Sequence, residues 1–264
     1  MRTSIISLLL LAASCTVVPL TGRKQLTAIP NSQMISLSAD SYSQVLREKK
    51  ISQNQGYVTR VRQTGNRLTA AVEKYLKENN MQSSLEGFSW QYNVLVSDEL
   101  NAWCMPGGQI AFYEGIMPVC ADDNGIAVVM GHEIAHAIAR HGNERMSQQL
   151  VIQMGGIALS EALKTQKEAT QQLALLAFGI GSKVGVELPY SRTHEAEADE
   201  LGLYFMAMAG YDPATAPAFW ERMKAKSSAR IPEFLSTHPD PSNRISDLKK
   251  HMPKALAYYR NSGK

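Results

Sequence analysis

The sequence predicts an α+β fold that is mainly α-helical, with a small antiparallel β-sheet beside one central helix. Two observations lead to this prediction. Most of the chain between residues 33 and 213 repeats its apolar side chains at helical spacing, and only residues 90–113 show the alternation and turn residues of short strands. With 264 residues, 44% of them hydrophobic, the chain can bury one sizeable core, so we expect a single domain over residues 33–264.

The first 32 residues have the features of a targeting segment followed by a tether. A short positive start leads into an apolar stretch over residues 5–13, and small residues then precede Cys15 as in a lipobox. We expect residues 1–14 to be a lipoprotein signal peptide, Cys15 to be lipidated, and residues 15–32 to be the tether. A plain cleaved signal and an unprocessed stretch are the alternatives, since Ala12 stands where lipoboxes usually have Leu.

Two helices and a small sheet are expected next. Residues 33–49 and 55–77 have helical periodicity, and the second helix carries an apolar stripe that most simply faces the core. Residues 90–96 alternate as a strand does, and the segments 100–105 and 109–113 flank Pro-Gly-Gly, which predicts a hairpin. The members of the apolar stripe are Val58, Val61, Leu68, Val72, Tyr75 and Leu76.

The sequence HEIAH, residues 132–136, predicts a metal site on a helix. Residues four apart share a helix face, so His132 and His136 can both reach one ion at about 2.0–2.1 Å. Glu133 lies beside that face, where its carboxylate can touch a bound water without ligating the ion. Asp122 to Asn124 can cap the helix and Gly142 can end it. The helical context favours this interpretation over a chance match.

Two histidines leave a catalytic metal one protein ligand short. His141 is rotated away from the metal face, so we expect it to be structural or solvent-facing. In a second predicted helix, over about residues 190–213, Glu195 and Asp199 share a face. This suits Glu195 as the third ligand and Asp199 as the acceptor of a hydrogen bond from a ligating histidine. A solvated acidic helix face is the alternative.

The neighbours of Glu195 are rejected as ligands. His194 points about 100° away from Glu195, and Glu197 also faces elsewhere. Residues 147–164 and 168–185, between the two metal helices, form two further apolar helices that contain glycine, which we expect to pair as a hairpin over the cleft. No apolar run has the length and composition expected of a membrane span.

Four landmarks resemble one family, in the same order along the chain. HEIAH followed by EAEAD, residues 195–199, is similar to the zinc endopeptidases that include the CAAX prenyl protease, HtpX and the mitochondrial Oma-type peptidases. LNAWCMPGGQIAFYEGIM, residues 100–117, resembles the hairpin before the HExxH helix of that family. STHPDPSNRI, residues 236–245, resembles its His-Pro … Arg segment. The bacterial envelope peptidases of the LoiP and BepA type are the most similar branch.

The resemblance implies a gluzincin metallopeptidase domain with one Zn²⁺ per chain. It implies that Glu195 is the third ligand and that Glu133 is the general base. It implies that His238 supports the oxyanion, although an ordinary loop histidine is the alternative, and that Arg244 fixes the loop of His238. It also places a substrate-binding edge strand along Asn101, Ala102, Trp103 and Cys104.

The expected function is hydrolysis of peptide bonds in misfolded or unassembled envelope proteins. A zinc-bound chaperone or assembly factor that does not cleave is the alternative. The lipid on Cys15 would tie the protein to a membrane, and Thr16 after it favours the outer membrane by resemblance to bacterial lipoproteins, with the catalytic domain facing the periplasm. The net charge of +3 comes with no basic patch interleaved with aromatic residues, so no nucleic acid partner is expected.

The cysteine count gives one further prediction. Lipidation of Cys15 leaves Cys104 and Cys120, and an even remainder in an oxidising compartment favours a disulfide. The alternative is two separately buried thiols.

Overall fold

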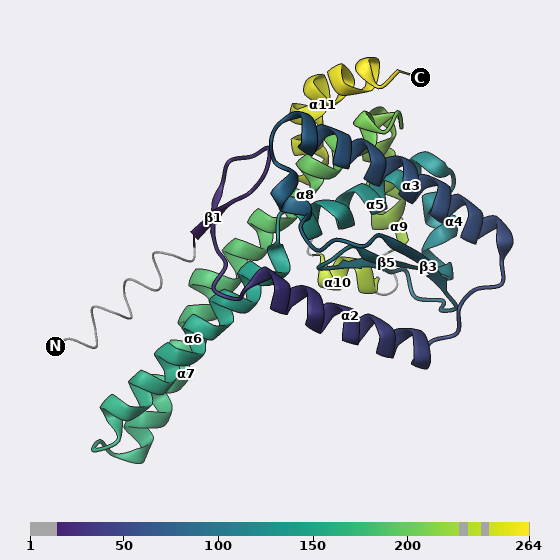
Figure 1. The fold of residues 1–264 in the computed structure, drawn as a ribbon. Helices are drawn as coiled ribbons and strands as arrows, with labels where there is room; N and C mark the ends of the chain where they lie inside the picture. Colours follow the sequence, from purple (N-terminus) through teal and green to yellow (C-terminus); the bar gives the residue numbers. More distant parts are fainter. Residues whose placement is uncertain (1–14, 227–231, 239–242, 264) are drawn as a thin grey trace.

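The computed structural model describes residues 15–226, 232–238 and 243–263. It shows a mainly helical body with a three-stranded sheet at its centre, from which one helical hairpin projects (Figure 1). The predicted fold class is confirmed. The elements are β1 (Cys15–Val17), β2 (Lys24–Leu26), α2 (Asn31–Glu48), α3 (Gln55–Glu78), β3 (Gln91–Leu95), β4 (Ala102–Met105), β5 (Gln109–Tyr113), α4 (Met117–Cys120), α5 (Asp123–Ile138), α6 (His141–Leu163), α7 (Glu168–Ser182), α8 (Leu188–Met208), α9 (Ala216–Lys226), α10 (Glu233–Thr237) and α11 (Arg244–Asn261).

The central sheet has the strand order β3-β5-β4. β4 and β5 form the predicted antiparallel hairpin, but β3 pairs with β5 in parallel, so the sheet is mixed rather than antiparallel throughout. This follows from the order of the strands, because the hairpin places β5 between β3 and the outer strand β4. Helices α2 and α3 cover opposite faces of the sheet: Tyr42 of α2 contacts Asn93, and Thr69 of α3 contacts Tyr92. β4 is left at an edge.

The two helices that carry the metal-binding motifs cross in close contact. Gly131 of α5 faces Gly202 of α8, and a Cβ atom at Gly202 would lie 2.7 Å from the backbone nitrogen of His132. Since this is closer than any side chain allows, only glycine at both positions permits the crossing. The contact brings the HExxH helix and the EAEAD helix together in the core of the body.

The end of α5 and the start of α8 differ from the expectation. Asp122 caps α5 as predicted, through a 2.9 Å hydrogen bond from Gly125 N–H. The helix ends at Ile138, however, because Arg140 takes a left-handed φ of 57°, and Gly142 lies inside α6. α8 starts at Leu188, slightly before the expected residue 190, because α7 continues into it through a π-helical turn at Lys183–Glu187.

The segment predicted as a tether is part of the domain. β1 pairs with β2, Val18 is buried, and Ala28 N–H donates to the hydroxyl of Ser147 on α6. The prediction of a free tether over residues 15–32 is therefore wrong for this packed stretch. The predicted signal peptide, residues 1–14, lies outside the described residues.

Helices α6 and α7 form the predicted hairpin, but it projects from the body and does not cover the cleft (Figure 1). Most of its large apolar side chains are exposed. Judged by length and composition, the continuous helix Glu168–Met208 is long and apolar enough to cross a membrane, so the prediction that no such run exists is wrong. The exposed members on the hairpin and the turn after it are Met146, Leu150, Val151, Met154, Ile157, Leu173, Leu176, Ile180 and Val184.

Candidate metal centre and active site

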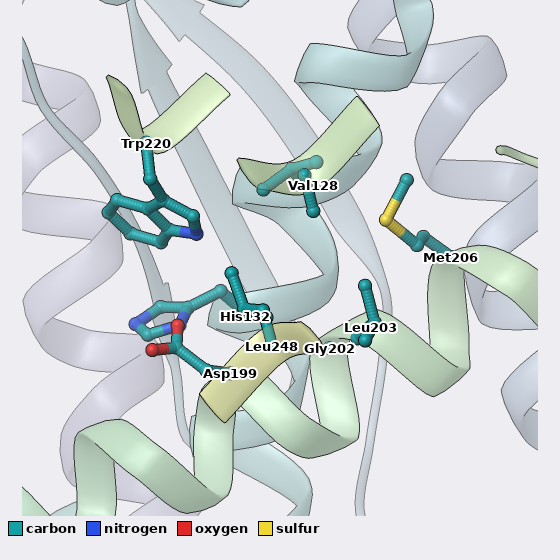
Figure 2. Close-up of a pocket in the computed structure, with 9 residues that line it drawn as sticks. Val128, His132, Asp199, Gly202, Leu203, Met206, Trp220 and Leu248 are labelled. Carbon is teal, nitrogen blue, oxygen red and sulfur yellow. The ribbon is translucent and has the colours of Figure 1, made fainter. Parts of the chain in front are cut away.

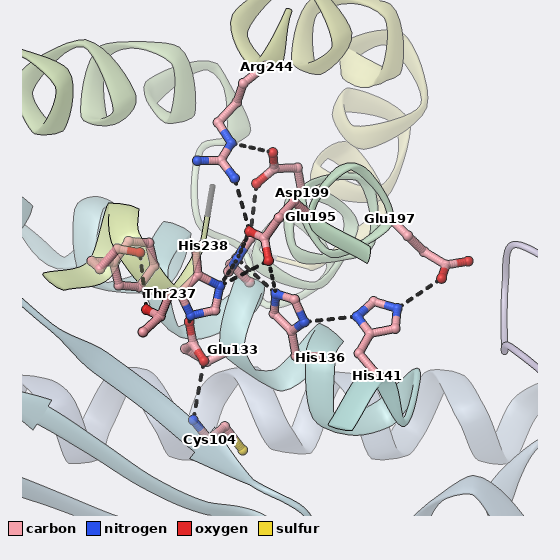
Figure 3. Close-up of polar contacts among 12 residues, drawn as sticks. Cys104, Glu133, His136, His141, Glu195, Glu197, Asp199, Thr237, His238 and Arg244 are labelled. Carbon is pink, nitrogen blue, oxygen red and sulfur yellow. Dashed lines mark hydrogen bonds and ion pairs between the residues drawn. The ribbon is translucent and has the colours of Figure 1, made fainter. Parts of the chain in front are cut away.

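Four predicted residues converge on one point at the crossing of α5 and α8. His132, His136, Glu195 and His238 each direct one ligand atom there. Figure 3 shows His136, Glu195 and His238 turned toward one another. The Nε2 atoms of His132 and His136 are 3.1 Å apart, and each lies 3.3 Å from a carboxylate oxygen of Glu195. Nδ1 of His238 lies 3.3 Å from Nε2 of His132 and 3.2 Å from Oε1 of Glu195.

These spacings fit a zinc ion. Ligand atoms about 2.0–2.1 Å from a tetrahedral ion are about 3.3–3.4 Å from one another, close to the distances observed here. The donor set of imidazole nitrogens and one carboxylate is also the set that zinc prefers in catalytic sites. The predicted ligands are therefore brought together, and His238 occupies the place of a fourth.

Buried polar partners orient the ligands from behind. Nδ1 of His132 is 2.9 Å from Asp199, as predicted, which leaves Nε2 to face the ion. Arg244 donates from Nε to Asp199 at 2.6 Å and from Nη2 to Glu195 at 3.1 Å. Its guanidinium also stacks 3.8 Å from the ring centre of Trp220. Arg244 thus fixes the two carboxylates, a more direct role than the predicted support of a loop.

Glu133 lies on the other side of the converging ligands, next to the sheet. Its Oε2 accepts the backbone N–H of Cys104 at 3.2 Å, and its Oε1 is 3.5 Å from Nε2 of His238. Burial raises the pKa of Glu133, against the opposing effect of His238 and His132. A carboxylate with a raised pKa, held beside a metal site, can exchange a proton with a bound water.

The predicted substrate edge is β4 itself. Tyr113 N–H donates to Asn101 C=O at 3.0 Å. In this antiparallel pair the odd-numbered residues of β4 therefore turn their backbone groups toward β5. The even-numbered residues Ala102 and Cys104 turn their backbone groups outward. There the N–H of Cys104 donates to Glu133, and the N–H of Ala102 donates to Oδ1 of Asn101. The side chain of Trp103 instead packs edge-on against Tyr42, 5.8 Å between ring centres. The edge is therefore formed by the backbone of Ala102 and Cys104.

Among the residues that the structure describes, two cavities can be seen to border the ligands. The first, about 10 Å³, lies behind His132 between Asp199 and Trp220 (Figure 2), and it has room for a single water at most. The second, about 90 Å³, opens between β4 and the end of α5, where Cys104 and His136 form part of its wall. Of these two cavities, the second alone is large enough for a side chain.

Three residues that the sequence left outside the site lie next to it: His141, His194 and Glu197. His141 is buried rather than solvent-facing, with Nδ1 2.8 Å from Nδ1 of His136 and Nε2 2.9 Å from Glu197. His194 points away from the ligands, as predicted, and its Nε2 is 2.8 Å from Glu144. The spacing of these residues was visible in the sequence, but their partners come from α6 and from the N-terminal segment, which periodicity does not place.

The predicted disulfide is not formed. In the described chain Cys104 and Cys120 are free thiols, the first on β4 and the second buried in α4. Burial, and then the nearby charge of Glu133, raise the pKa of Cys104 well above its ordinary value, so this thiol stays protonated beside the site. Cys15 is exposed at the start of β1.

Comparisons with known proteins agree with this geometry. The chain is 30% identical over 240 residues to the mitochondrial metalloendopeptidase OMA1 of Schizosaccharomyces pombe, covering 90% of this chain and 66% of that protein. It is 35% identical over 201 residues to the OMA1 of Saccharomyces cerevisiae, covering 72% and 55%. The beta-barrel assembly-enhancing protease of Escherichia coli is 30% identical over 169 residues, covering 61% and 34%.

The chain thus spans between about one third and two thirds of the length of these relatives. The pattern of peptidase family M48 matches residues 62–252, which include every residue of the converging ligand set. On this match, and with a site that fits zinc, the chain belongs to peptidase family M48.

Proposed function

We propose that the protein is a zinc-dependent endopeptidase. The observation that carries this proposal is the position of Glu133, a buried carboxylate that lies beside the converging ligand set and also accepts a hydrogen bond from the edge strand. A protein that only bound polypeptides would have no use for a base in this place. His132, His136 and Glu195 would hold the ion. When bound, zinc acidifies a water and polarises a carbonyl.

Glu133 would move the proton in this reaction. Its carboxylate accepts a proton from the attacking water and then passes it to the amine that leaves as the C–N bond breaks. Its raised pKa brings the carboxylate closer to the pH at which it can both accept and release a proton. The N–H of Cys104 keeps the carboxylate turned toward the cleft.

The polypeptide substrate would bind along β4 by strand addition. The outward carbonyl groups of Ala102 and Cys104 can accept hydrogen bonds from an extended chain, which would place a peptide carbonyl next to Glu133. One substrate side chain would enter the cavity of about 90 Å³ beside His136. Since main-chain pairing does not read sequence, the protein would accept many chains, provided that they are locally extended. This favours unfolded or misassembled polypeptides as substrates.

His238 would have two roles. In the structure its Nδ1 lies in the position of a fourth ligand, where it would exclude water and keep the enzyme inactive. Its segment is tied to the cleft, because Phe234 N–H donates to Leu100 C=O at 3.0 Å and the ring of Phe234 stacks on His238. A substrate strand that docks on β4 would displace this segment, and the freed imidazole could then donate to the oxyanion.

We place the protein in the bacterial envelope, at the outer membrane, through a lipid on Cys15. Support comes from the lipobox-like residues before Cys15, from its exposed position, and from a relative named as a beta-barrel assembly-enhancing protease. Other relatives are named as mitochondrial. Incorporation of labelled palmitate into the wild type but not into Cys15→Ser tests the lipid, and fractionation of the membranes tests the compartment.

Turnover of an unfolded protein substrate tests the function. The wild type should cleave it and Glu133→Gln should not, while both bind it and both carry zinc. Equal cleavage by the two proteins would exclude Glu133 as the base. Binding without cleavage by the zinc-loaded wild type and by His238→Ala would instead establish the chaperone alternative.

A further inference from the structure

A chain of buried polar contacts leads from His136 to the N-terminal segment. Nδ1 of His136 meets Nδ1 of His141 at 2.8 Å, and Nε2 of His141 meets Oε2 of Glu197 at 2.9 Å (Figure 3). Glu197 in turn accepts from Nε of Arg23 at 2.9 Å and from the hydroxyl of Thr21. The imidazole of His141 and the carboxylate of Glu197 are both buried.

A metal ion at Nε2 of His136 would determine where the protons in this chain of contacts lie. If Nε2 of His136 faces an ion, it carries no proton, so the proton of this neutral ring is on Nδ1 and is donated to Nδ1 of His141. His141 then carries its own proton on Nε2 and donates it to the carboxylate of Glu197. Each contact has one donor and one acceptor. Glu197 thus sets the tautomer of His141, and His141 sets the tautomer of His136.

Arg23 is the cation that keeps Glu197 in place. Besides Glu197, it donates to both oxygens of Glu144 at 2.8 and 3.0 Å, so one guanidinium connects two buried carboxylates of α6 and α8. The side chain of Arg23 is only 21% exposed. It follows the turn between β1 and β2, where Val18 N–H is bonded to Arg23 C=O at 2.8 Å.

We propose that Thr21 and Arg23 are positioning residues of the metal centre, which act on His136 through Glu197 and His141. The packed N-terminal hairpin, β1 to β2, then helps to position a ligand of the metal centre. The inference rests on the zinc site proposed above, with His136 as a ligand. It assigns a role to four residues that lie outside the ligand set: Thr21, Arg23, His141 and Glu197.

The other ligating histidine has the same kind of support in shorter form. His132 donates directly to Asp199, and Arg244 neutralises Asp199. For His136 the corresponding carboxylate is that of Glu197, which it reaches only through His141. Arg23 neutralises Glu197, as Arg244 neutralises Asp199. Both carboxylates belong to α8, on different faces, and both arginines come from other parts of the chain. An interposed imidazole transmits the orientation only if Glu197 is itself fixed, which is the task of Arg23 and Thr21.

Zinc affinity of the full chain, purified in detergent, tests the proposal by competition with a colorimetric chelator. Glu197→Gln and Arg23→Gln should each weaken zinc binding by about 10-fold or more, as the loss of a partner behind a ligand does. Arg23→Lys should recover part of this loss, because the ammonium can reach one carboxylate but not both. Arg60→Gln is the matched control: Arg60 pairs with Asp123 at the start of α5, at 2.6 Å on the surface, and its loss should leave zinc affinity unchanged.

A spectroscopic readout separates positioning from general destabilisation. In the zinc-loaded wild type, the ¹⁵N signals of His136 should report a single tautomer protonated on Nδ1. In Glu197→Gln these signals should broaden or shift while the thermal unfolding of the metal-free protein stays close to that of the wild type. If Arg23→Gln does not fold, Glu197→Gln and Thr21→Val carry the test.

Wild-type zinc affinity and an unchanged His136 signal in Glu197→Gln and Thr21→Val would overturn the proposal. His136→Ala identifies the level at which it fails. If His136→Ala binds zinc normally, the zinc site itself is wrong. If His136→Ala loses zinc but the Glu197 and Thr21 variants do not, only the role of the N-terminal segment is wrong.

Discussion

Substitution of Gly202 by alanine tests how closely the two metal-binding helices must approach. A Cβ atom at residue 202 would lie 2.7 Å from the nitrogen of His132 and 2.8 Å from the carbonyl carbon of Gly131. Ordinary contact starts at 3.4 Å, so α5 and α8 would have to separate by about 0.7 Å, the difference between 3.4 and 2.7 Å. All the atoms that would have to yield belong to the backbone, and no side chain can turn away to relieve the contact.

The separation should affect the metal centre more than the stability. Overpacking costs about 1–3 kcal/mol, and alanine recovers about 1 kcal/mol of helix propensity, so the net loss is about 0–2 kcal/mol. The melting temperature should then fall by at most about 8 °C. Glu195, on the displaced helix, would move away from His132 by a similar distance, beyond the tolerance of about 0.5 Å for such sites. Zinc affinity should fall at least about 10-fold, and kcat/KM by about 100-fold.

Thermal unfolding, zinc competition and peptide hydrolysis are measured side by side for Gly202→Ala and a control. Gly179→Ala is the control, because Gly179 lies exposed inside α7 with no atom within 4 Å of the added Cβ. This variant should be stabilised by about 0.5–1 kcal/mol with unchanged zinc affinity and activity. If Gly202→Ala melts within the expected range yet binds zinc as the wild type does, the close crossing does not position the ligands and the reasoning is wrong.

Three further predictions concern the site and its support. Glu195→Ala should lose most of the bound zinc while His194→Ala keeps it, by metal analysis of the purified proteins; the reverse ranking would refute the ligand assignment. His238→Ala should change turnover of an unfolded substrate, upward if the imidazole mainly excludes water and downward by about 10²–10³ in kcat if it mainly supports the oxyanion; unchanged kinetics would reduce it to a loop residue. Burial alone would raise the pKa of Glu144, but hydrogen bonds from His194 and Arg23 outweigh this effect and lower the pKa below 4.5. The stability that this carboxylate contributes is therefore present above pH 4.5, and it is lost as the pH falls through the folded-state pKa. The melting-temperature difference between wild type and Glu144→Gln should therefore shrink as the pH falls below 4.5, and a difference that stays constant until the wild type itself unfolds in acid would contradict this.

The sequence alone predicts the relative positions of residues whose neighbours are fixed by local geometry. His132, Glu133 and His136 share one helix, so their spacing alone predicts the face that they form. Glu195 and Asp199 required only a second helix with the same kind of periodicity. The hairpin of β4 and β5 was likewise visible from its turn residues. In each case a few consecutive residues determine the relevant geometry.

The remaining features depend on contacts between distant segments. The angle of His141 from the metal face correctly predicts that it is not a ligand. The angle does not show, however, that His141 contacts Glu197 or that Glu197 in turn contacts Arg23. The N-terminal segment has the Pro, Gly and Thr content of a tether, and only its packing on α6 and α8 shows otherwise. Similarly, the parity of cysteines predicted a disulfide, whereas Cys104 and Cys120 lie in different elements as free thiols. Composition gives no distance between such residues.

Helix α8 shows how the short sequence EAEAD places three carboxylates in three different environments. In EAEAD the three carboxylates are two residues apart, and each step of two turns the helix by about 200°. Glu195 and Asp199 therefore return to the face that meets α5, one toward the ion and the other behind His132, while Glu197 lies on the opposite side, toward His141 and Arg23. A shift of α8 would move all three carboxylates together. A single helix, α8, consequently couples the position of the N-terminal segment to the geometry of the metal centre. Substitution of Arg23, which acts through Glu197, and substitution of Gly202, which acts through the contact with α5, should disturb the same ligand set.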